Sequence, residues 1–125
     1  MYNSVLITGS SGFLGSHLKN TLISRNYEVH ELSGDIRGIC DFNKSVDVVF
    51  HLAAKTKGSE FKNNLSNSFD INISGTQAVL NYCARNNTTC IFISTCGVYK
   101  PTANNTYAKE DSLIQPVSSY AISKF

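Results

Sequence analysis

The sequence contains no long hydrophobic run and no excess of charge of one sign. Its apolar stretches all fall well short of the roughly 18 residues that a membrane-spanning helix needs. The N-terminal segment has no basic region and reaches a glycine at Gly9, so we expect no signal peptide and a cytoplasmic protein. Lys and Arg total 11 and Asp and Glu total 9, and the net charge of +2 offers no electrostatic case for binding nucleic acid or an anionic membrane.

Cysteine pairs with metal-binding spacing are absent as well. The chain has four cysteines (Cys40, Cys83, Cys90 and Cys96), and none forms a C-x-x-C pair, so we expect no metal site. In a cytoplasmic protein we also expect no disulfide framework. Repeats and low-complexity tracts are missing. A chain of 125 residues with 42% hydrophobic and 16% charged residues is typical of one globular domain.

Short apolar runs alternate with helical patterns along the chain. Strands are predicted at 5–7, 27–32, 46–52 and 90–93, and helices from the glycines to Asn26, at 71–85 and from about Ser118. This alternation predicts an α/β fold with a parallel sheet and helices on both faces. The 13 residues of 33–45 cannot hold an extra strand with a crossover on each side, so we expect four full strands and at most a stub at Asp35–Ile36.

Three glycines spaced as G-x-x-G-x-x-G join the first strand to the first helix. Gly9 permits a tight turn, Gly12 lets the backbone approach a pyrophosphate, and Gly15 allows close packing of the helix on the strand. The helix N-terminus then offers free N–H donors to phosphate oxygens. Because the pattern directly follows a strand and opens a helix, we interpret it as a dinucleotide-binding loop rather than a turn that binds nothing.

Tyr120 and Lys124 are four residues apart, which places both side chains on one face of a helix. An ammonium next to a phenol favours the phenolate, so the pair is a candidate acid/base device, although a plain surface contact has the same spacing. Thr95 follows the strand at 90–93, at the sheet edge where α/β proteins bind ligands, and its alternative is a strand-end turn. Asn72 opens the helical segment at 71–85, and its alternative is a helix N-cap.

The glycine loop and further motifs in order together resemble the NAD-dependent epimerase/dehydratase family, the extended branch of the short-chain dehydrogenases/reductases that UDP-galactose epimerase typifies. These further motifs are Val48–Ala54, Asn72–Thr76, Ser94–Tyr99 and Tyr120–Lys124, with Gly34–Ile36 as a weaker one. The resemblance covers essentially the whole chain. It implies a three-layer Rossmann-like sheet of about four to five strands, incomplete in this chain, and a nucleotide-sugar epimerase, dehydratase or reductase.

The resemblance also assigns roles to residues. Tyr120 would exchange a proton with a sugar hydroxyl, Thr95 would hydrogen-bond the same oxygen, and Lys124 would hold the nicotinamide ribose and favour the phenolate. The hydride would pass between the sugar carbon and a bound NAD or NADP. The implied cofactor-binding residues are Gly9, Ser11, Gly12, Phe13, Leu14, Gly15, Asp35, Ile36, Leu52, Ala53, Ala54, Asn72 and Lys124.

The sequence departs from the family pattern where the adenosine ribose would bind. Ser33 stands in place of the usual acidic residue, and Arg37 is close by, which leaves both NAD and NADP open, with NAD slightly favoured by the family. Asp35 and Ile36 are the implied adenine contacts, and Asp41–Phe42 is the rival pair for that role. The implied partners are a small-molecule substrate and, for a full-length form, a second copy in a homodimer.

The last residue, Phe125, directly follows Lys124, whereas family members run to several hundred residues. We therefore expect residues 1–125 to be an NAD(P)-binding domain truncated within its Tyr120 helix, without the substrate domain. Such a chain is expected to bind its cofactor weakly and to turn over little substrate. The alternatives are a non-catalytic dinucleotide-binding module and an inactive remnant of a longer enzyme.

Overall fold

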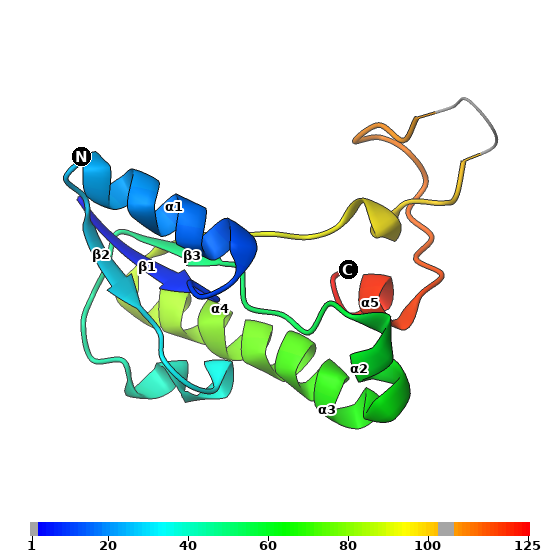
Figure 1. The fold of residues 1–125 in the computed structure, drawn as a ribbon, viewed down its shortest axis with the longest axis horizontal. Coiled ribbons are helices and arrows are strands. Elements are labelled where there is room, and N and C mark those ends of the chain that lie inside the picture. The colour runs from blue at the N-terminus through cyan, green and yellow to red at the C-terminus, as the bar shows by residue number, and fades with distance from the viewer. Residues whose placement is uncertain (1–2, 103–106) are drawn as a thin grey trace.

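The computed structural model describes residues 3–102 and 107–125. Its centre is a four-stranded parallel sheet in the order β2-β1-β3-β4, formed by β1 (Ser4–Thr8), β2 (Glu28–Glu31), β3 (Val48–His51) and β4 (Thr89–Phe92) (Figure 1). The predicted parallel α/β fold with four full strands is confirmed. No strand forms at Asp35–Ile36 in the described part of the chain, because Asp35 instead caps a 3₁₀ helix, η1 (Ile36–Asp41).

The register of the sheet brings the ends of β1, β3 and β4 to one edge. Thr8 lies opposite His51, and His51 lies opposite Phe92. Because all the strands run in the same direction, the loops that follow them leave from this shared edge, which is the ligand-binding edge of an open α/β sheet. The glycine loop follows β1 there, so the sheet positions it beside the segments that follow β3 and β4.

Helices cover both faces of the sheet, as expected. Helix α1 (Phe13–Ser24) lies on one face, and α4 (Gly75–Asn86) with η1 lies on the other (Figure 1). Asn26 takes a left-handed backbone conformation with φ of 61° just after α1, which agrees with the predicted end of that helix. Gly15 is the one residue of α1 that is fully buried, and it packs against the backbone of Gly9 and Ser10 that follows β1.

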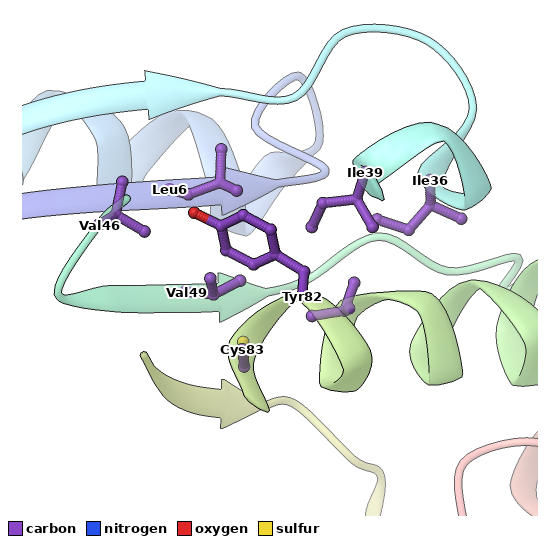
Figure 2. Close-up of a cluster of buried hydrophobic side chains, with 8 residues drawn as sticks. Leu6, Ile36, Ile39, Val46, Val49, Tyr82 and Cys83 are labelled. Atoms are coloured by element: carbon purple, nitrogen blue, oxygen red, sulfur yellow. The ribbon is translucent and has the colours of Figure 1, made fainter. Parts of the chain in front are cut away.

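The main hydrophobic core lies between the sheet and the α4 face. Leu6 and Val49 of the central strands face Tyr82 of α4, with Ile36 and Ile39 of η1 beside them (Figure 2). The Tyr82 ring is 1% exposed, and its hydroxyl donates a 2.6 Å hydrogen bond to the carbonyl oxygen of residue 44. The 33–45 segment is short, and its 3₁₀ helix η1 therefore packs over the sheet in the place that a crossover helix would otherwise occupy.

The helix predicted at 71–85 begins earlier than its apolar pattern indicates. Helix α3 (Leu65–Phe69) leads into a π-helical turn, η2 (Asp70–Ser74), which continues as α4. The prediction that Asn72 opens a helix, and its N-cap alternative, are wrong, because Asn64 caps this helical stretch with its side-chain oxygen on the Asn67 N–H. Within the π turn the Gly75 N–H donates to the Asp70 carbonyl oxygen, five residues back.

The remaining elements lie beside the carboxyl edge of the sheet. Helix α2 (Gly58–Asn63) and the four-residue helix α5 (Ser119–Ile122) pack against each other, and a 3₁₀ turn, η3 (Cys96–Val98), also contacts α5. Ser118 caps α5 by accepting a 3.1 Å hydrogen bond from the Ala121 N–H. Among the described helices, none is long and apolar enough to cross a membrane.

Candidate functional site: a groove around the glycine loop

The backbone at the glycine loop leaves no room for side chains at Gly9 and Gly15. A Cβ atom at Gly15 would lie 2.2 Å from the Gly9 carbonyl oxygen, and one at Gly9 would lie 2.8 Å from the Ala53 nitrogen. Gly9 also has a positive φ of 74°. At Gly12 a Cβ would lie 3.3 Å from the Gly9 oxygen. The three glycines thus bring the loop, the start of α1 and the end of β3 together as a bare backbone cradle at a helix N-terminus, which suits phosphate.

Two cavities meet at this cradle and share Gly9, Gly12, Leu52, Ala54 and Thr56. One, of about 730 Å³, extends toward η1, and the other, of about 290 Å³, extends toward α5. The first is also lined by Ser11, Gly34, Asp35, Ile36, Ala53, Lys55, Lys57, Glu60 and Ile71, and the second by Phe13, Leu14, Gly15, Ile93, Tyr120 and Lys124. Together they form a groove with the glycine loop at its middle, a shape that fits an extended dinucleotide with its pyrophosphate on the loop.

At the η1 end of the groove, Asp35 and Ile36 line the wall as predicted. The Arg37 guanidinium pairs with both Asp35 and Asp70, and it lines a separate cavity against α4 rather than the groove. Hydrogen bonds from the Arg37 side chain and backbone lower the pKa of Asp35 to about 2. Arg37 is therefore already bound to two carboxylates. The rival pair Asp41–Phe42 does not line the groove, since Phe42 packs between the rings of His30 and Tyr82.

A buried hydrogen-bonded chain lies beneath the groove and contains His51. Thr76 donates its hydroxyl hydrogen to the Asn72 carbonyl oxygen at 2.6 Å, so it can only accept from His51 Nε2, which is 2.8 Å away. His51 Nδ1 then accepts from the Thr8 hydroxyl at 2.8 Å, and Thr8 accepts from the Ala53 N–H at 3.2 Å. Burial, with a smaller effect of the Lys124 charge, lowers the pKa of His51 to about 4, so it is a neutral, packed histidine.

The Asn72 side chain connects two segments of the site that are far apart in sequence. Its oxygen accepts from the Lys55 N–H at 2.7 Å, and its amide nitrogen donates to the Lys55 carbonyl at 2.9 Å and to Ser123 Oγ at 2.8 Å. Ser123 Oγ in turn donates to the Tyr120 carbonyl oxygen at 2.7 Å. Asn72 is 1% exposed and does not line the groove. It holds the β3–α2 loop against the end of α5.

Glu60 fixes the rest of the β3–α2 loop. Its carboxylate accepts from the Thr56 and Lys57 N–H groups at 3.2 and 3.1 Å and pairs with the Lys55 ammonium at 3.0 Å. These partners, the Lys55 side chain first, lower the pKa of Glu60. The loop that forms the wall of the groove opposite the glycines is thus held by Asn72 from below and by Glu60 from the side.

Tyr120 and Lys124 both reach the smaller cavity, as their spacing predicts. The Tyr120 ring packs edge-on against Phe61 of α2, with ring centres 6.1 Å apart. Lys124 is 3% exposed, and burial lowers its pKa to about 8. The predicted common helix holds only for Tyr120, because α5 ends at Ile122 and Lys124 lies in the turn that follows it. Contacts with α2, β4 and Asn72, rather than the length of this short helix, place the phenol and the amine at one end of the groove.

Thr95 lies at the end of β4 but does not line either part of the groove. It caps η3, and its hydroxyl oxygen accepts a 3.2 Å hydrogen bond from the Gly97 N–H, so the strand-end turn that was its alternative is present. A Cβ at Gly97 would touch Ala121 of α5 at 3.5 Å, which shows how closely this turn packs on the Tyr120 helix. Turn formation uses the oxygen of Thr95 as an acceptor and leaves its hydroxyl hydrogen available to donate.

The structure thus gathers all of the predicted cofactor-binding residues except Asn72 along one groove, together with Tyr120. Sequence reasoning missed the β3–α2 loop, whose Thr56 belongs to both cavities. The rule that ligands bind at the carboxyl ends of parallel strands also applies to the residues after Ala54, and it is the sequence signal that points to this loop. Thr8 and Thr76 were also missed, because their partnership with His51 joins three distant parts of the chain.

Comparison with known proteins gives similarities over nearly the whole chain. A curated relative, the decarboxylating sterol-4-alpha-carboxylate 3-dehydrogenase of Dictyostelium discoideum, is 29% identical over 91% of this chain and 42% of its own length. The structure of a Thermus thermophilus UDP-glucose 4-epimerase in complex with NAD has a TM-score of 0.84 and 26% identity, covering 97% of this chain and 47% of that one. The structure of RMD from Pseudomonas aeruginosa complexed with NADPH has a TM-score of 0.81 and 26% identity, covering 98% and 46%.

The chain therefore spans less than half the length of each of these proteins. Its match to the sequence model of one family extends over residues 5–125, which include the glycine loop, the groove and the Tyr120 helix. On that match the chain belongs to the NAD-dependent epimerase/dehydratase family.

Proposed function

We propose that this chain binds NAD or NADP in the groove and forms the cofactor-binding part of an enzyme that acts on a nucleotide sugar. The observation that carries the proposal is the groove itself, which has a bare glycine cradle at its middle and Tyr120 with Lys124 at one end. A binding module without catalysis needs the cradle, but it does not need an acid/base pair beside the reacting end of the cofactor.

The bare backbone of the glycine cradle is the feature that suits this groove to a dinucleotide. The N–H groups at the start of α1 and the glycine backbone would hold the pyrophosphate, and the wall at Asp35 and Ile36 would hold the adenosine. Lys124 would bind the nicotinamide ribose. A bound nicotinamide supplies hydride transfer to or from a carbon of the substrate. The Arg37 guanidinium is bound to Asp35 and Asp70, so a 2′-phosphate would have to compete with two carboxylates for it.

The proton chemistry belongs to α5 and the turn before it. Tyr120 would take the proton from a sugar hydroxyl or return it, and Lys124 lines the same cavity. Thr95 would donate its hydroxyl hydrogen to the same substrate oxygen. The hydrogen bonds of Asn72 to the Lys55 backbone and Ser123 would keep Tyr120 in a fixed position relative to the wall of the groove.

The nucleotide-sugar class is supported by the likeness to a UDP-glucose 4-epimerase, and the full enzyme is proposed to be a homodimer. The similarity to a sterol-carboxylate dehydrogenase shows that this scaffold also serves other substrates. A thermal unfolding experiment tests the proposed substrate class. If the class is correct, UDP-glucose protects the cofactor-loaded protein against thermal unfolding, and an excess of free glucose does not. Sedimentation of the same protein gives its oligomeric state.

Cofactor binding is tested by NADH and NADPH fluorescence titrations of the wild type and two alanine variants. Gly12→Ala places a methyl group between the two cavities and is expected to weaken binding at least tenfold. Gly38→Ala is the matched control, because a Cβ there meets no atom within 4 Å and the residue lies outside the groove. Equal affinities for the two variants would sink the assignment of the groove.

The catalytic assignment needs its own experiment. Tyr120→Phe removes the phenolic hydroxyl and leaves the ring packed on Phe61, so NADH affinity is expected to change less than twofold while turnover of the nucleotide sugar falls by a factor of 10² or more. Turnover that survives the substitution would exclude Tyr120 as the acid/base. Cofactor binding without turnover in the wild type would favour the non-catalytic module.

A further inference from the structure

Lys124 is a buried ammonium without an acidic partner. It is 3% exposed, yet none of the ion pairs in the described part of the chain includes it. Buried lysines are normally paired with a carboxylate, because an isolated charge is costly to remove from water. Something other than a carboxylate must therefore hold this side chain in position at the end of the groove.

Two side chains of the β4 edge hold Lys124 at both of its ends. The ammonium lies over the ring of Phe92, 4.0 Å from the ring centre. Ser94 donates a 2.8 Å hydrogen bond to the Lys124 carbonyl oxygen. Phe92 and Ser94 are two residues apart in extended chain and so point to the same side. One short segment thus fixes the backbone of Lys124 and the far end of its side chain.

We infer that Phe92 is a positioning residue for the cofactor: its ring holds the Lys124 ammonium at the end of the groove and so prepares it to bind the hydroxyl groups of a nicotinamide ribose. The inference rests on the proposed function and goes beyond it, since it assigns a role to an aromatic side chain that does not itself line the groove. An aromatic face attracts an ammonium without accepting its hydrogens in the directed way of a carboxylate. The three N–H donors of Lys124 are thus left for the ligand.

A ring suits this position better than a carboxylate for a second reason. An ion pair would occupy the Lys124 donors and hold them against a competing ribose hydroxyl, as Asp35 and Asp70 hold Arg37. Among residues 3–102 and 107–125, the titratable groups near the ammonium are His51, whose ring centre lies 5.6 Å from that of Phe92, and Tyr120, which lines the same cavity. His51 is neutral above pH 5, so it adds no charge to this end of the groove.

The test uses NMR of the free protein together with NADH titrations, on the wild type and three variants. Phe92→Leu removes the ring, and Phe92→Tyr keeps it. Ile91→Leu is the matched control, because Ile91 is the neighbouring β4 residue, is 39% exposed and does not line the groove. In the wild type, the ring current is expected to shift the Lys124 Hε protons upfield.

Phe92→Leu is expected to abolish the upfield shift, to lower the midpoint of the Lys124 titration by about half a pH unit and to raise the NADH Kd about two- to fivefold. Phe92→Tyr is expected to restore all three values, and Ile91→Leu to change none of them.

The inference is overturned if Phe92→Leu leaves the Hε shift in place. It is also overturned if the wild type binds NADH and Phe92→Leu removes the shift but binds NADH with the same affinity. A wild type that binds no NADH refutes the proposed function instead. In that case the Lys124 titration in the free protein still decides whether Phe92 holds the ammonium, and an unchanged midpoint in Phe92→Leu overturns the inference.

Discussion

Protonation of His51 is expected to destabilise the fold in mildly acidic solution. Its neighbours allow only the neutral form with hydrogen on Nε2, because Thr76 has already given its hydroxyl hydrogen to the Asn72 carbonyl. Burial lowers the pKa of His51 from 6.5 to about 4. Between these two values the unfolded chain binds a proton that the folded chain does not. The contribution of His51 is therefore constant above pH 6.5 and is lost as the pH falls through that window.

The size of the effect follows from the two pKa values. Each pH unit within the window costs about 1.4 kcal/mol, so a fall from pH 6.5 to pH 5 removes about 2 kcal/mol of the free energy of unfolding. The full difference, reached near pH 4, is about 3 kcal/mol. A side chain that is 1% exposed needs little discount for screening by solvent. Most carboxylates begin to titrate only below pH 5, so the range from pH 7 to pH 5 isolates the histidine.

The assay is urea unfolding at pH 7.0 and at pH 5.2 for the wild type, His51→Gln and His17→Gln. His17 is exposed on α1, so its replacement is expected to leave the pH dependence in place, whereas His51→Gln is expected to remove most of it. If His51→Gln does not fold, the NMR titration of the wild-type ring gives the same answer. A wild-type stability that is equal at both pH values, or a His51 ring that titrates near pH 6.5, would refute the reasoning.

Two further substitutions test the packing of the site. Gly15→Ala is expected to lower the free energy of unfolding by about 2 kcal/mol in thermal or urea unfolding. The overlap of its Cβ with the Gly9 carbonyl costs more free energy than the higher helix propensity of alanine returns. The control, Gly38→Ala, is expected to stay within about 0.5 kcal/mol of the wild type. Asn72→Ala removes the three hydrogen bonds of a buried side chain and is expected to cost about 3 kcal/mol and to speed amide exchange in α5. Unchanged exchange there would contradict its role as a connector.

Local patterns were sufficient to predict the elements that carry the cofactor cradle. The apolar run of β3 and the glycine spacing after β1 each encode their structure within a few residues. The spacing of Tyr120 and Lys124 predicts that they lie together, and both line the smaller cavity, although α5 ends at Ile122, before Lys124. The resemblance to a known family supplied the roles. These predictions succeed because backbone sterics and helix periodicity are local properties of the chain.

The connections beneath the groove could not be predicted in the same way. The role of Asn72 depends on a π turn, which shifts a side chain out of the usual helical register and has no distinct sequence signal. Its partners, at Lys55 and Ser123, are 17 and 51 residues away. The position of Arg37 depends likewise on Asp70, 33 residues along the chain. Such contacts exist only once the tertiary structure brings the segments together.

The central place of β1 in the sheet also constrains how this protein can fold during synthesis. The strand nearest the N-terminus pairs on one side with β2 and on the other with β3, whose residues lie 43 positions later. One edge of its apolar segment Val5–Ile7 therefore has no strand to pair with until β3, which ends at His51, has been translated. During this interval the unpaired strand edge is prone to aggregation, and slower translation of 9–51 would lengthen it.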